Sequence, residues 1–364
     1  MSERLPVFPW DTVADLSATA AAHPDGVIDL SVGTPVDPVP DVVQQALAAA
    51  ADSPGYPATA GSASLRSAAA GWLQRRSGAV GIDPDRHVLP SIGSKELVAW
   101  LPTLLGLGAD DLIVVPELAY PTYEIGARLA GAVPLRADAT SALGPQRPAL
   151  IWINTPANPS GRVLGVEHLR KMVAFARQRG ALLVSDECYL ELGWEARPVS
   201  VLHRDVCDGD VTGLLAVHSL SKRSNLAGYR AGLVAGDPDV IAELLAVRKH
   251  AGMMTPAPVQ AAAAAAWGDD EHVNVQRSRY RRRRDVLLAG LRAAGFRVDD
   301  SEAGLYLWAS RGEPGRQTAA WLADRGLLVA PGDFYGPAGR DHVRVALTVS
   351  DAGAEAAAAR LAAG

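Results

Sequence analysis

The sequence of 364 residues has few cysteines and no long apolar run. Two cysteines, Cys188 and Cys207, are too few for a disulfide framework, and neither has partners at the spacing of zinc ligands. This usage fits a reducing compartment and predicts no metal site. No stretch approaches the roughly 18 to 20 apolar residues of a membrane span, and prolines follow the first residues where a signal peptide would be hydrophobic. We therefore expect a cytoplasmic protein without a membrane partner.

An excess of positive charge is also missing. The formal net charge of -5 argues against a general attraction to nucleic acid or to an anionic membrane. The exception is a run of four arginines at 281–284, within a segment at about 271–294 that has the spacing of a long helix. Consecutive residues spread around a helix, so a solvated or salt-bridged surface is favoured over a nucleic-acid site.

Length and apolar content favour a large fold. Single hydrophobic cores usually stop growing at about 250 to 300 residues, and this chain is longer. Its hydrophobic fraction of 48% is ample for a packed core. We expect two domains, or one large domain with a lobe.

The middle of the chain alternates apolar runs with amphipathic segments, the pattern of an α/β sheet with helices on both faces. Residues 120–131 and 166–179 have helical spacing. Several of the apolar runs contain no polar position, as expected for strands buried on both faces. The predicted strands are 112–115, 149–153, 181–185, 213–218 and 231–235.

Both ends of the chain differ from this middle. The first 30 or so residues indicate an arm with one short helix, and the alanine run at 261–266 predicts a closely packed helix. After the long helix the pattern becomes a mixture of α and β. The elements predicted there are strands at 296–298, 305–308, 327–330 and 342–346, a helix at 317–325, and an alanine-rich helix at the C-terminus.

Polar residues directly follow three of the predicted strands. In open α/β sheets, ligands bind at the carboxyl ends of the strands, so these residues are the first candidates for a site. The groups that follow the strands are 154–161, 186–189 and 219–222.

Lys222 is the strongest single candidate. Ser219 and Ser221 place hydroxyls beside it, and Arg230 follows eight positions later. This arrangement suits a lysine that forms an imine with a phosphorylated aldehyde. A free lysine titrates near ~10.4, so the amine needs burial or nearby cations to lose its proton. Arg230 supplies both a positive field and a planar fork for a phosphate, although a lone lysine after a strand is more often a solvated loop residue.

The other strand-end residues fit pyridoxal 5'-phosphate (PLP), an electron sink whose ring nitrogen must stay protonated. A carboxylate at that nitrogen holds the charge in place, and Asp186 is the candidate. Tyr189 and Asn158 are candidates to donate hydrogen bonds to the cofactor's phenolate oxygen. In isolation, a turn cap would be the favoured interpretation of Asp186, and Asn158 would indicate only an Asn-Pro turn.

Three further residues extend this site. Ser94 and Lys95 precede a helical run at 97–105, and a helix N-terminus binds phosphate readily, although Gly-Ser is also a common N-cap. Tyr120 is a candidate to stack on the pyridine ring, with ordinary packing as the alternative.

Arg344 alternates with apolar residues in the predicted strand at 342–346. Such an arginine either faces water or is buried with a carboxylate partner. The α-carboxylate of a substrate is one possible partner.

Taken in order, these motifs resemble the class I/II, fold-type I aminotransferases over nearly the whole chain. The motifs are Gly33-Thr34-Pro35, Tyr56-Pro57-Ala58-Thr59-Ala60-Gly61, Leu65-Arg66, Gly93-Ser94-Lys95-Glu96, Asn158-Pro159-Ser160-Gly161, Asp186-Glu187-Cys188-Tyr189, Ser219-Leu220-Ser221-Lys222, Gly228-Tyr229-Arg230-Ala231-Gly232 and Val343-Arg344.

The resemblance implies a mostly parallel seven-stranded sheet in a large PLP-binding domain of residues 37–270. It implies a smaller α+β domain formed by residues 1–36 and 271–364. It also implies a homodimer with shared active sites, in which Tyr56 reaches the cofactor phosphate of the partner subunit.

The same resemblance implies roles for individual residues. Lys222 would hold the cofactor and act as the base for the proton shift, and Arg344 would clamp the substrate carboxylate near the backbone of Gly33 and the side chain of Asn158. The implied phosphate grip consists of Ser94, Ser219 and Arg230.

More narrowly, the segments 5–11 and 29–38 are similar to actinobacterial N-succinyldiaminopimelate aminotransferases of lysine biosynthesis. This implies transfer of an amino group from N-succinyl-LL-2,6-diaminopimelate to 2-oxoglutarate. The alternatives are another donor, such as an aromatic amino acid or alanine, or a PLP-dependent lyase or decarboxylase. Thr34 stands where the family usually has an acidic residue. No spacing selects the group that binds the distal succinyl carboxylate among Arg4, Lys95, Arg223 and Arg248.

Overall fold

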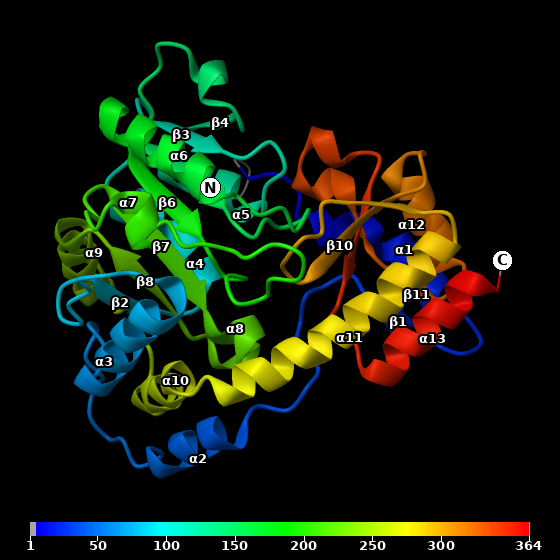
Figure 1. The fold of residues 1–364 in the computed structure, drawn as a ribbon, viewed down its shortest axis with the longest axis horizontal. Helices are drawn as coiled ribbons and strands as arrows, with labels where there is room; N and C mark the ends of the chain where they lie inside the picture. Colours follow the sequence, from blue (N-terminus) through cyan, green and yellow to red (C-terminus); the bar gives the residue numbers. More distant parts are fainter. Residues whose placement is uncertain (1–4, 364) are drawn as a thin grey trace.

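The computed structural model describes residues 5–363, and a seven-stranded sheet forms its larger half (Figure 1). The strand order is β2-β8-β7-β6-β5-β3-β4, and only β8 runs antiparallel to its neighbours. The prediction of a mostly parallel seven-stranded sheet is confirmed. The strands are β2 (Val88–Ser91), β3 (Leu112–Val115), β4 (Val133–Arg136), β5 (Leu150–Asn154), β6 (Leu182–Asp186), β7 (Leu214–Ser219) and β8 (Gly232–Gly236).

Alternating residues of the central strands pack against helices on opposite faces of this sheet. Ile151 and Ile153 of β5 face a core with the first set of helices, whereas Leu150 and Trp152 face a core with the second set. This period of two explains why the strands read as unbroken apolar runs. The first set is α3 (Ala63–Trp72), α6 (Val166–Arg179) and α10 (Ala257–Gly268), and the second set is α4 (Ser94–Leu104), α5 (Thr122–Ala130) and α9 (Pro238–Ala251).

The smaller half joins the N-terminal segment to the last third of the chain (Figure 1). β1 (Ile28–Asp29) pairs in parallel with β11 (Leu327–Leu328), and the N-terminal helix α1 (Ala14–Ala21) packs on α12 (Gly315–Ala323). A four-stranded antiparallel sheet of order β12-β13-β10-β9 lies beside them. Its strands are β9 (Arg297–Asp299), β10 (Tyr306–Ser310), β12 (Ala330–Pro331) and β13 (Val343–Ala346).

A long helix, α11 (Glu271–Ala293), runs from the large half to α13 (Asp351–Ala362) in the small half (Figure 1). Because of this arrangement, we propose the division into residues 37–270 and residues 1–36 with 271–364. Other helices are α2 (Asp41–Ala49), α7 (Arg204–Cys207), α8 (Leu220–Arg223), the π-helix Leu73–Ser77 and the 3-10 helices Pro9–Val13, Thr140–Leu143, Ala227–Tyr229, Gly332–Tyr335 and Pro337–Gly339.

The arginine run on α11 forms ion pairs. Arg283 donates to both carboxylate oxygens of Asp37 at 2.7 Å and to Asp351 at 2.6 Å. Arg284 donates to Glu195 at 2.5 Å. The prediction of salt bridges is confirmed. The alternative of a solvated face is wrong for Arg283 and Arg284, because both side chains are buried.

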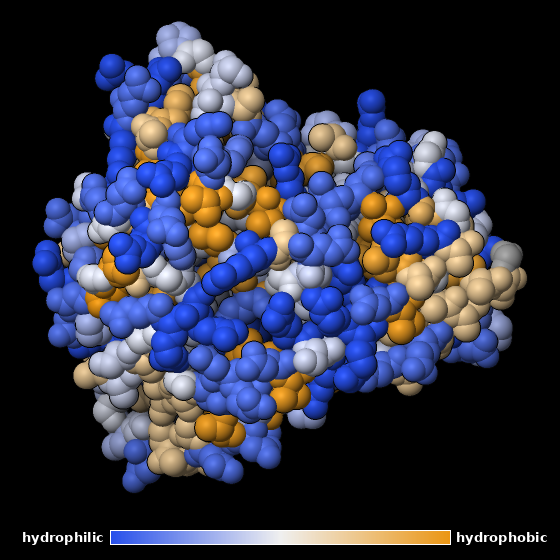
Figure 2. Space-filling model, viewed as in Figure 1, coloured by the Kyte–Doolittle hydropathy of each residue, from blue (hydrophilic) through white to orange (hydrophobic). Residues whose placement is uncertain are grey.

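The face shown in Figure 2 is largely hydrophilic, with weakly apolar areas over α13 and over α2 and α10. Alanines are frequent in these helices, which explains the pale colour. Within residues 5–363, no helix has the length and apolar character to cross a membrane. The same part of the chain contains no group of three or more His, Cys, Asp or Glu side chains placed to hold a metal ion.

Candidate active site

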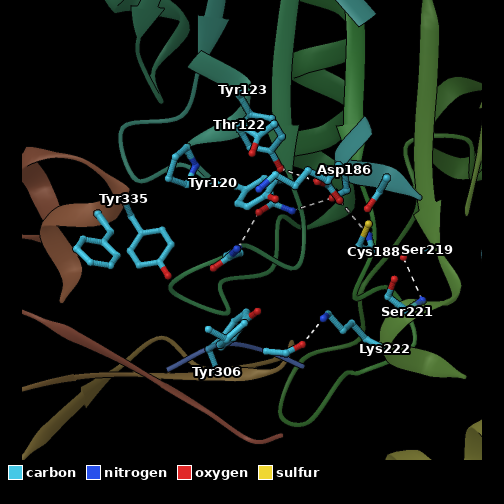
Figure 3. Close-up of a pocket in the computed structure, with 18 of the residues that line it drawn as sticks. Tyr120, Thr122, Tyr123, Asp186, Cys188, Ser219, Ser221, Lys222, Tyr306 and Tyr335 are labelled. Atoms are coloured by element: carbon cyan, nitrogen blue, oxygen red, sulfur yellow. Dashed lines mark hydrogen bonds between the residues drawn. The ribbon is translucent and has the colours of Figure 1, made fainter. Parts of the chain in front are cut away.

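A cavity of about 470 Å³ lies at the carboxyl ends of β5, β6 and β7, where the strand-end residues were expected to meet (Figure 3). Residues of β10, β13 and the N-terminal arm close its other side. Tyr56 does not line it, and its side chain is 100% exposed. The other predicted residues all line the cavity: Gly33, Ser94, Lys95, Tyr120, Asn158, Asp186, Tyr189, Ser219, Ser221, Lys222, Arg230 and Arg344.

Lys222 lies on α8, the short helix that follows β7, and its Nζ donates a hydrogen bond to the carbonyl oxygen of Gly33. Burial lowers the pKa of Lys222, and although Tyr306 opposes this, the charges of Arg344 and Arg230 add to the lowering. The amine therefore loses its proton more readily than a free lysine and is a better nucleophile.

Asp186 ends β6 and is only 6% exposed. Its Oδ2 accepts a hydrogen bond from the hydroxyl of Tyr123 at 2.7 Å, and its Oδ1 accepts one from the backbone N–H of Cys188 at 3.1 Å (Figure 3). Burial raises the pKa of Asp186, and these two bonds lower it part of the way back. Within residues 5–363, this carboxylate has no salt bridge, so a ligand that carries a protonated ring nitrogen would complete it.

Arg344 enters the cavity from β13 and is 4% exposed. Its Nη1 donates to Oδ1 of Asn158 at 2.9 Å, and its Nη2 donates to the carbonyl oxygen of Ser31 at 2.6 Å. Nε is buried without a partner in the described part of the chain, and no carboxylate there pairs with the guanidinium. A buried guanidinium with no acid is a fitting receptor for the carboxylate of a ligand.

The N-terminus of α4 forms a third corner of the cavity. Ser94 and Lys95 occupy its first turn, and the preceding Gly93 has a φ of 77°. A Cβ at Gly93 would also clash with the guanidinium of Arg230, so the glycine permits the arginine to lie against the helix start. Free backbone N–H groups and a guanidinium together suit a phosphate.

Two serines lie between this corner and Lys222. Ser219 ends β7, and its hydroxyl accepts a hydrogen bond from the backbone N–H of Ser221 at 3.1 Å. Both side chains are buried and line the cavity, so their hydroxyls can serve a phosphate or a neighbouring polar group.

Two of the tyrosines predicted for the site have raised pKa values. Burial raises the pKa of Tyr120 to about 12 and also raises the pKa of Tyr189 well above its ordinary value. The hydroxyl of Tyr189 lies 3.1 Å from that of Tyr306. Tyr120 contacts Tyr123 edge to face, with 5.7 Å between ring centroids.

Sequence reasoning missed several residues that line the cavity. Tyr306 lies between two leucines in a strand, and Tyr123 lies in a helix whose spacing is typical of packing against a core. Neither position therefore stands out as part of a site. Trp10 of the N-terminal arm contacts Phe334 at 5.3 Å between ring centroids, a pairing that no local pattern indicates. The missed residues include Phe8, Trp10, Tyr123, Tyr306, Phe334 and Tyr335.

Three of the four cations considered for a distal carboxylate are among the described residues, and of these three only Lys95 lines the cavity. Arg223 is buried in an ion pair with Glu191, and Arg248 is buried in one with Glu96. Arg4 lies outside the described residues. The Lys95 ammonium lies 5.7 Å from the ring centroid of Phe8.

Comparison with known proteins agrees with this geometry. The family model for aminotransferase class I and II matches residues 25–361. A probable aminotransferase of Mycobacterium tuberculosis is 68% identical over 361 residues, which cover 99% of this chain and 86% of that protein. The 4-dedimethylamino-4-oxo-anhydrotetracycline transaminase OxyQ of Streptomyces rimosus is 58% identical over 357 residues, which cover 98% of this chain and 99% of that protein.

Among solved structures, the probable N-succinyldiaminopimelate aminotransferase of Thermus thermophilus superimposes with a TM-score of 0.86. It is 30% identical in sequence, and the match covers 98% of this chain and 99% of that chain.

Proposed function

The chain belongs to the class I and II aminotransferase family, and from this premise we propose that it moves an amino group from N-succinyl-LL-2,6-diaminopimelate to 2-oxoglutarate. The reaction would proceed in two half-reactions at one site and would serve lysine biosynthesis. The relative from Thermus thermophilus, which is named for this donor, supports the proposal. The family has the fold-type I architecture and depends on PLP.

One observation carries the chemistry. Among residues 5–363, the buried carboxylate of Asp186 has no cation and the buried guanidinium of Arg344 has no acid, and the same cavity holds a lysine whose pKa is lowered. A buried charge without a partner costs free energy, so we infer that a ligand supplies a cationic partner for Asp186 and an anionic partner for Arg344. PLP together with an amino acid supplies the missing partners: a protonated ring nitrogen, a carboxylate and an aldehyde for the amine.

The residues of the cavity fit PLP, which supplies an electron sink for the pair released at the substrate's α-carbon. Lys222 would hold the cofactor, Asp186 would face its ring nitrogen, and Tyr120 would stack on the ring. Tyr189 and Asn158 would face its phenol oxygen. The phosphate would be held by the first turn of α4 with Ser94 and Lys95, and by Ser219, Ser221 and Arg230.

Arg344 would bind the substrate α-carboxylate, assisted by Asn158 and the backbone of Gly33. The contact between Nζ of Lys222 and the carbonyl of Gly33 brings the amine close to this carboxylate site. Nζ would then be the base that removes and returns the proton of the α-carbon.

Lys95 is our choice for the distal succinyl carboxylate. Arg223 and Arg248 are occupied by acids, whereas Lys95 has no salt bridge among the described residues and lines the cavity. Because Lys95 also starts α4, its ammonium could serve the phosphate instead, and a variant of this residue distinguishes the two uses.

A bulky, largely apolar substrate is the second candidate. Phe8, Trp10 and Phe334 line the cavity, and OxyQ, which is 58% identical, is named as a 4-dedimethylamino-4-oxo-anhydrotetracycline transaminase. A lyase or decarboxylase would use the same lysine and aspartate and is the third candidate.

We further propose a cytoplasmic homodimer with shared sites. Tyr56 supports this assembly, because its side chain is fully exposed and therefore free to reach the cofactor phosphate of a partner subunit.

A panel of amino donors tests the proposed function, with glutamate formed from 2-oxoglutarate as the readout. We expect the succinylated diamine to give the highest kcat/KM. Turnover of aromatic donors or alanine without turnover of the succinylated diamine would overturn the donor, and consumption of donors without glutamate would overturn transamination. Borohydride reduction followed by mass spectrometry should place the cofactor on Lys222, and a Lys222→Ala protein should carry no label.

A further inference from the structure

Tyr306 is a buried residue that lines the cavity, and it has none of the roles proposed above (Figure 3). It lies on β10, opposite Ala346 of β13 and two residues from Trp308, which is opposite Arg344. The guanidinium carbon of Arg344 lies 3.8 Å from the centroid of the Tyr306 ring. The aromatic face thus supports the cation from one side, as in a desolvated cation–π contact.

The hydroxyl of Tyr306 faces the other end of the site. It lies 3.1 Å from the hydroxyl of Tyr189. It also rests against Gly33, where an added Cβ would clash with it. The carbonyl of Gly33 accepts the hydrogen bond from Lys222. Tyr306 therefore contacts both Gly33, which binds the amine, and Arg344, the proposed receptor of the substrate carboxylate.

The two phenols differ in acidity. Burial raises the pKa of Tyr306, but the charges of Arg344 and Lys222 and the hydrogen bond with Tyr189 together leave the pKa below its ordinary value, with Cys188 acting in the opposite sense. The pKa of Tyr189 is raised by burial and by Tyr306 itself. The phenol with the lower pKa is the stronger donor, so Tyr306 is favoured as the donor and Tyr189 as the acceptor. This direction leaves the hydrogen of Tyr189 free for the cofactor's phenol oxygen.

We infer that Tyr306 is a positioning residue of this site, which orients the hydroxyl of Tyr189 through its own hydroxyl and holds the guanidinium of Arg344 with its ring. The inference rests on the proposed roles of Lys222, Tyr189 and Arg344. It does not depend on the identity of the amino donor.

The two parts of Tyr306 are tested by two variants. Tyr306→Phe keeps the ring and removes the hydroxyl that donates to Tyr189. Tyr189 then donates more weakly to the cofactor's phenol oxygen, which disfavours the deprotonated form of the bound cofactor. In a pH titration of the cofactor absorbance of the holoenzyme, we expect the midpoint to rise by about 0.5 to 1 unit.

Tyr306→Leu removes the ring as well. We expect it to raise the KM of every carboxylate substrate by about tenfold beyond the value for Tyr306→Phe, because the guanidinium loses its aromatic support. Tyr335→Phe is the matched control, because its ring centroid lies 4.9 Å from the Arg344 guanidinium carbon but its hydroxyl has no bond to Tyr189. Its absorbance midpoint should match that of the wild type.

The inference is overturned if Tyr306→Phe titrates as the wild type does, or if Tyr335→Phe shifts by the same amount. It is also overturned if Tyr306→Leu and Tyr306→Phe have equal KM values. These results would leave the proposed function standing as long as borohydride labels Lys222, whereas label on another residue would remove the proposed function itself.

Discussion

The hydroxyl of Tyr123 donates to Oδ2 of Asp186 at 2.7 Å, and both side chains are buried. The ring of Tyr123 stacks on Trp152 of β5, with 4.8 Å between centroids and 21° between planes. This stack fixes the hydroxyl, and the hydroxyl fixes the carboxylate at the end of β6. Because burial raises the pKa of Asp186 and this bond lowers it, Tyr123 helps to keep the carboxylate ionised.

Tyr123→Phe should therefore weaken the binding of PLP. A hydrogen bond to a charged group contributes about 1.5 to 3 kcal/mol, so we expect the Kd of PLP to rise about tenfold or more. Equilibrium dialysis of the apoprotein against PLP measures this change. Tyr120→Phe removes a nearby hydroxyl but leaves the bond to Asp186, so its effect should be smaller. Equal affinities of Tyr123→Phe and the wild type would contradict the role of Tyr123.

Arg344 and Arg283 are both buried arginines, but their partners predict opposite effects on substitution. Arg344→Met removes a cation without an acid, so the free energy of unfolding should stay unchanged or rise. The KM of donors and of 2-oxoglutarate should rise about 10- to 100-fold, because a charge-assisted contact to the substrate is lost. Steady-state kinetics and urea unfolding measure the two effects.

Arg283→Met is the matched comparison, because this arginine pairs with Asp37 and Asp351 and none of the three residues lines the cavity. It should lower the free energy of unfolding by about 3 kcal/mol, since Asp37 is left without its main cation. The KM values of the folded protein should stay near those of the wild type. A large loss of stability in Arg344→Met would show that its role is structural.

The central strands could be predicted from sequence because both of their faces are buried, so that β5, β6, β7 and β8 read as continuous apolar runs. The predictions missed β2 and β4, which are the two edges of the sheet. Pro90 lies in β2 and Pro134 in β4. Proline within a run argues against a strand, and it is tolerated at edges because one side of an edge strand needs no backbone donor.

Some residues of the site can also be recognised from the neighbouring sequence, whereas others can be recognised only in the folded structure. Asp186, Ser219 and Lys222 stand out in the sequence because they follow apolar strands directly. Tyr123 and Tyr306 do not, because their polar partners lie 63 and 117 residues away in the chain. Only the packing of α5 and β10 against the strand ends brings these hydroxyls to the cavity.

Lys95→Met distinguishes the two uses of the Lys95 ammonium. If it binds the distal carboxylate, the KM of N-succinyl-LL-2,6-diaminopimelate should rise about tenfold while the KM of alanine stays unchanged, because only the former loses a charge contact. Lys171→Met removes an exposed lysine from α6 and controls for the change in net charge. A rise in the Kd of PLP with equal effects on both donors would place Lys95 at the phosphate instead.

Glu187 lies behind the cavity wall in a buried position that makes the stability of the protein depend on pH. Its Oε1 accepts a hydrogen bond from the N–H of Val201 at 2.7 Å, whereas its Oε2 lies 3.6 Å from Nε2 of His218 without a hydrogen-bond partner among the described residues. Burial raises the pKa of Glu187 from 4.5 to about 7. Burial lowers the pKa of His218 to about 3, so the histidine is neutral and does not offset the carboxyl group.

Because the folded protein holds the proton of Glu187 more tightly than the unfolded chain, the stability from this group is complete below pH 4.5 and is lost as the pH rises to about 7. Glu187→Gln removes this loss. The free energy of unfolding of the variant minus that of the wild type should therefore increase with pH over this window, by up to about 1.4 kcal/mol per unit. Parallel urea unfolding of the two apoproteins across the window measures the difference, and a constant difference would show that Glu187 titrates at its ordinary pKa in the folded protein.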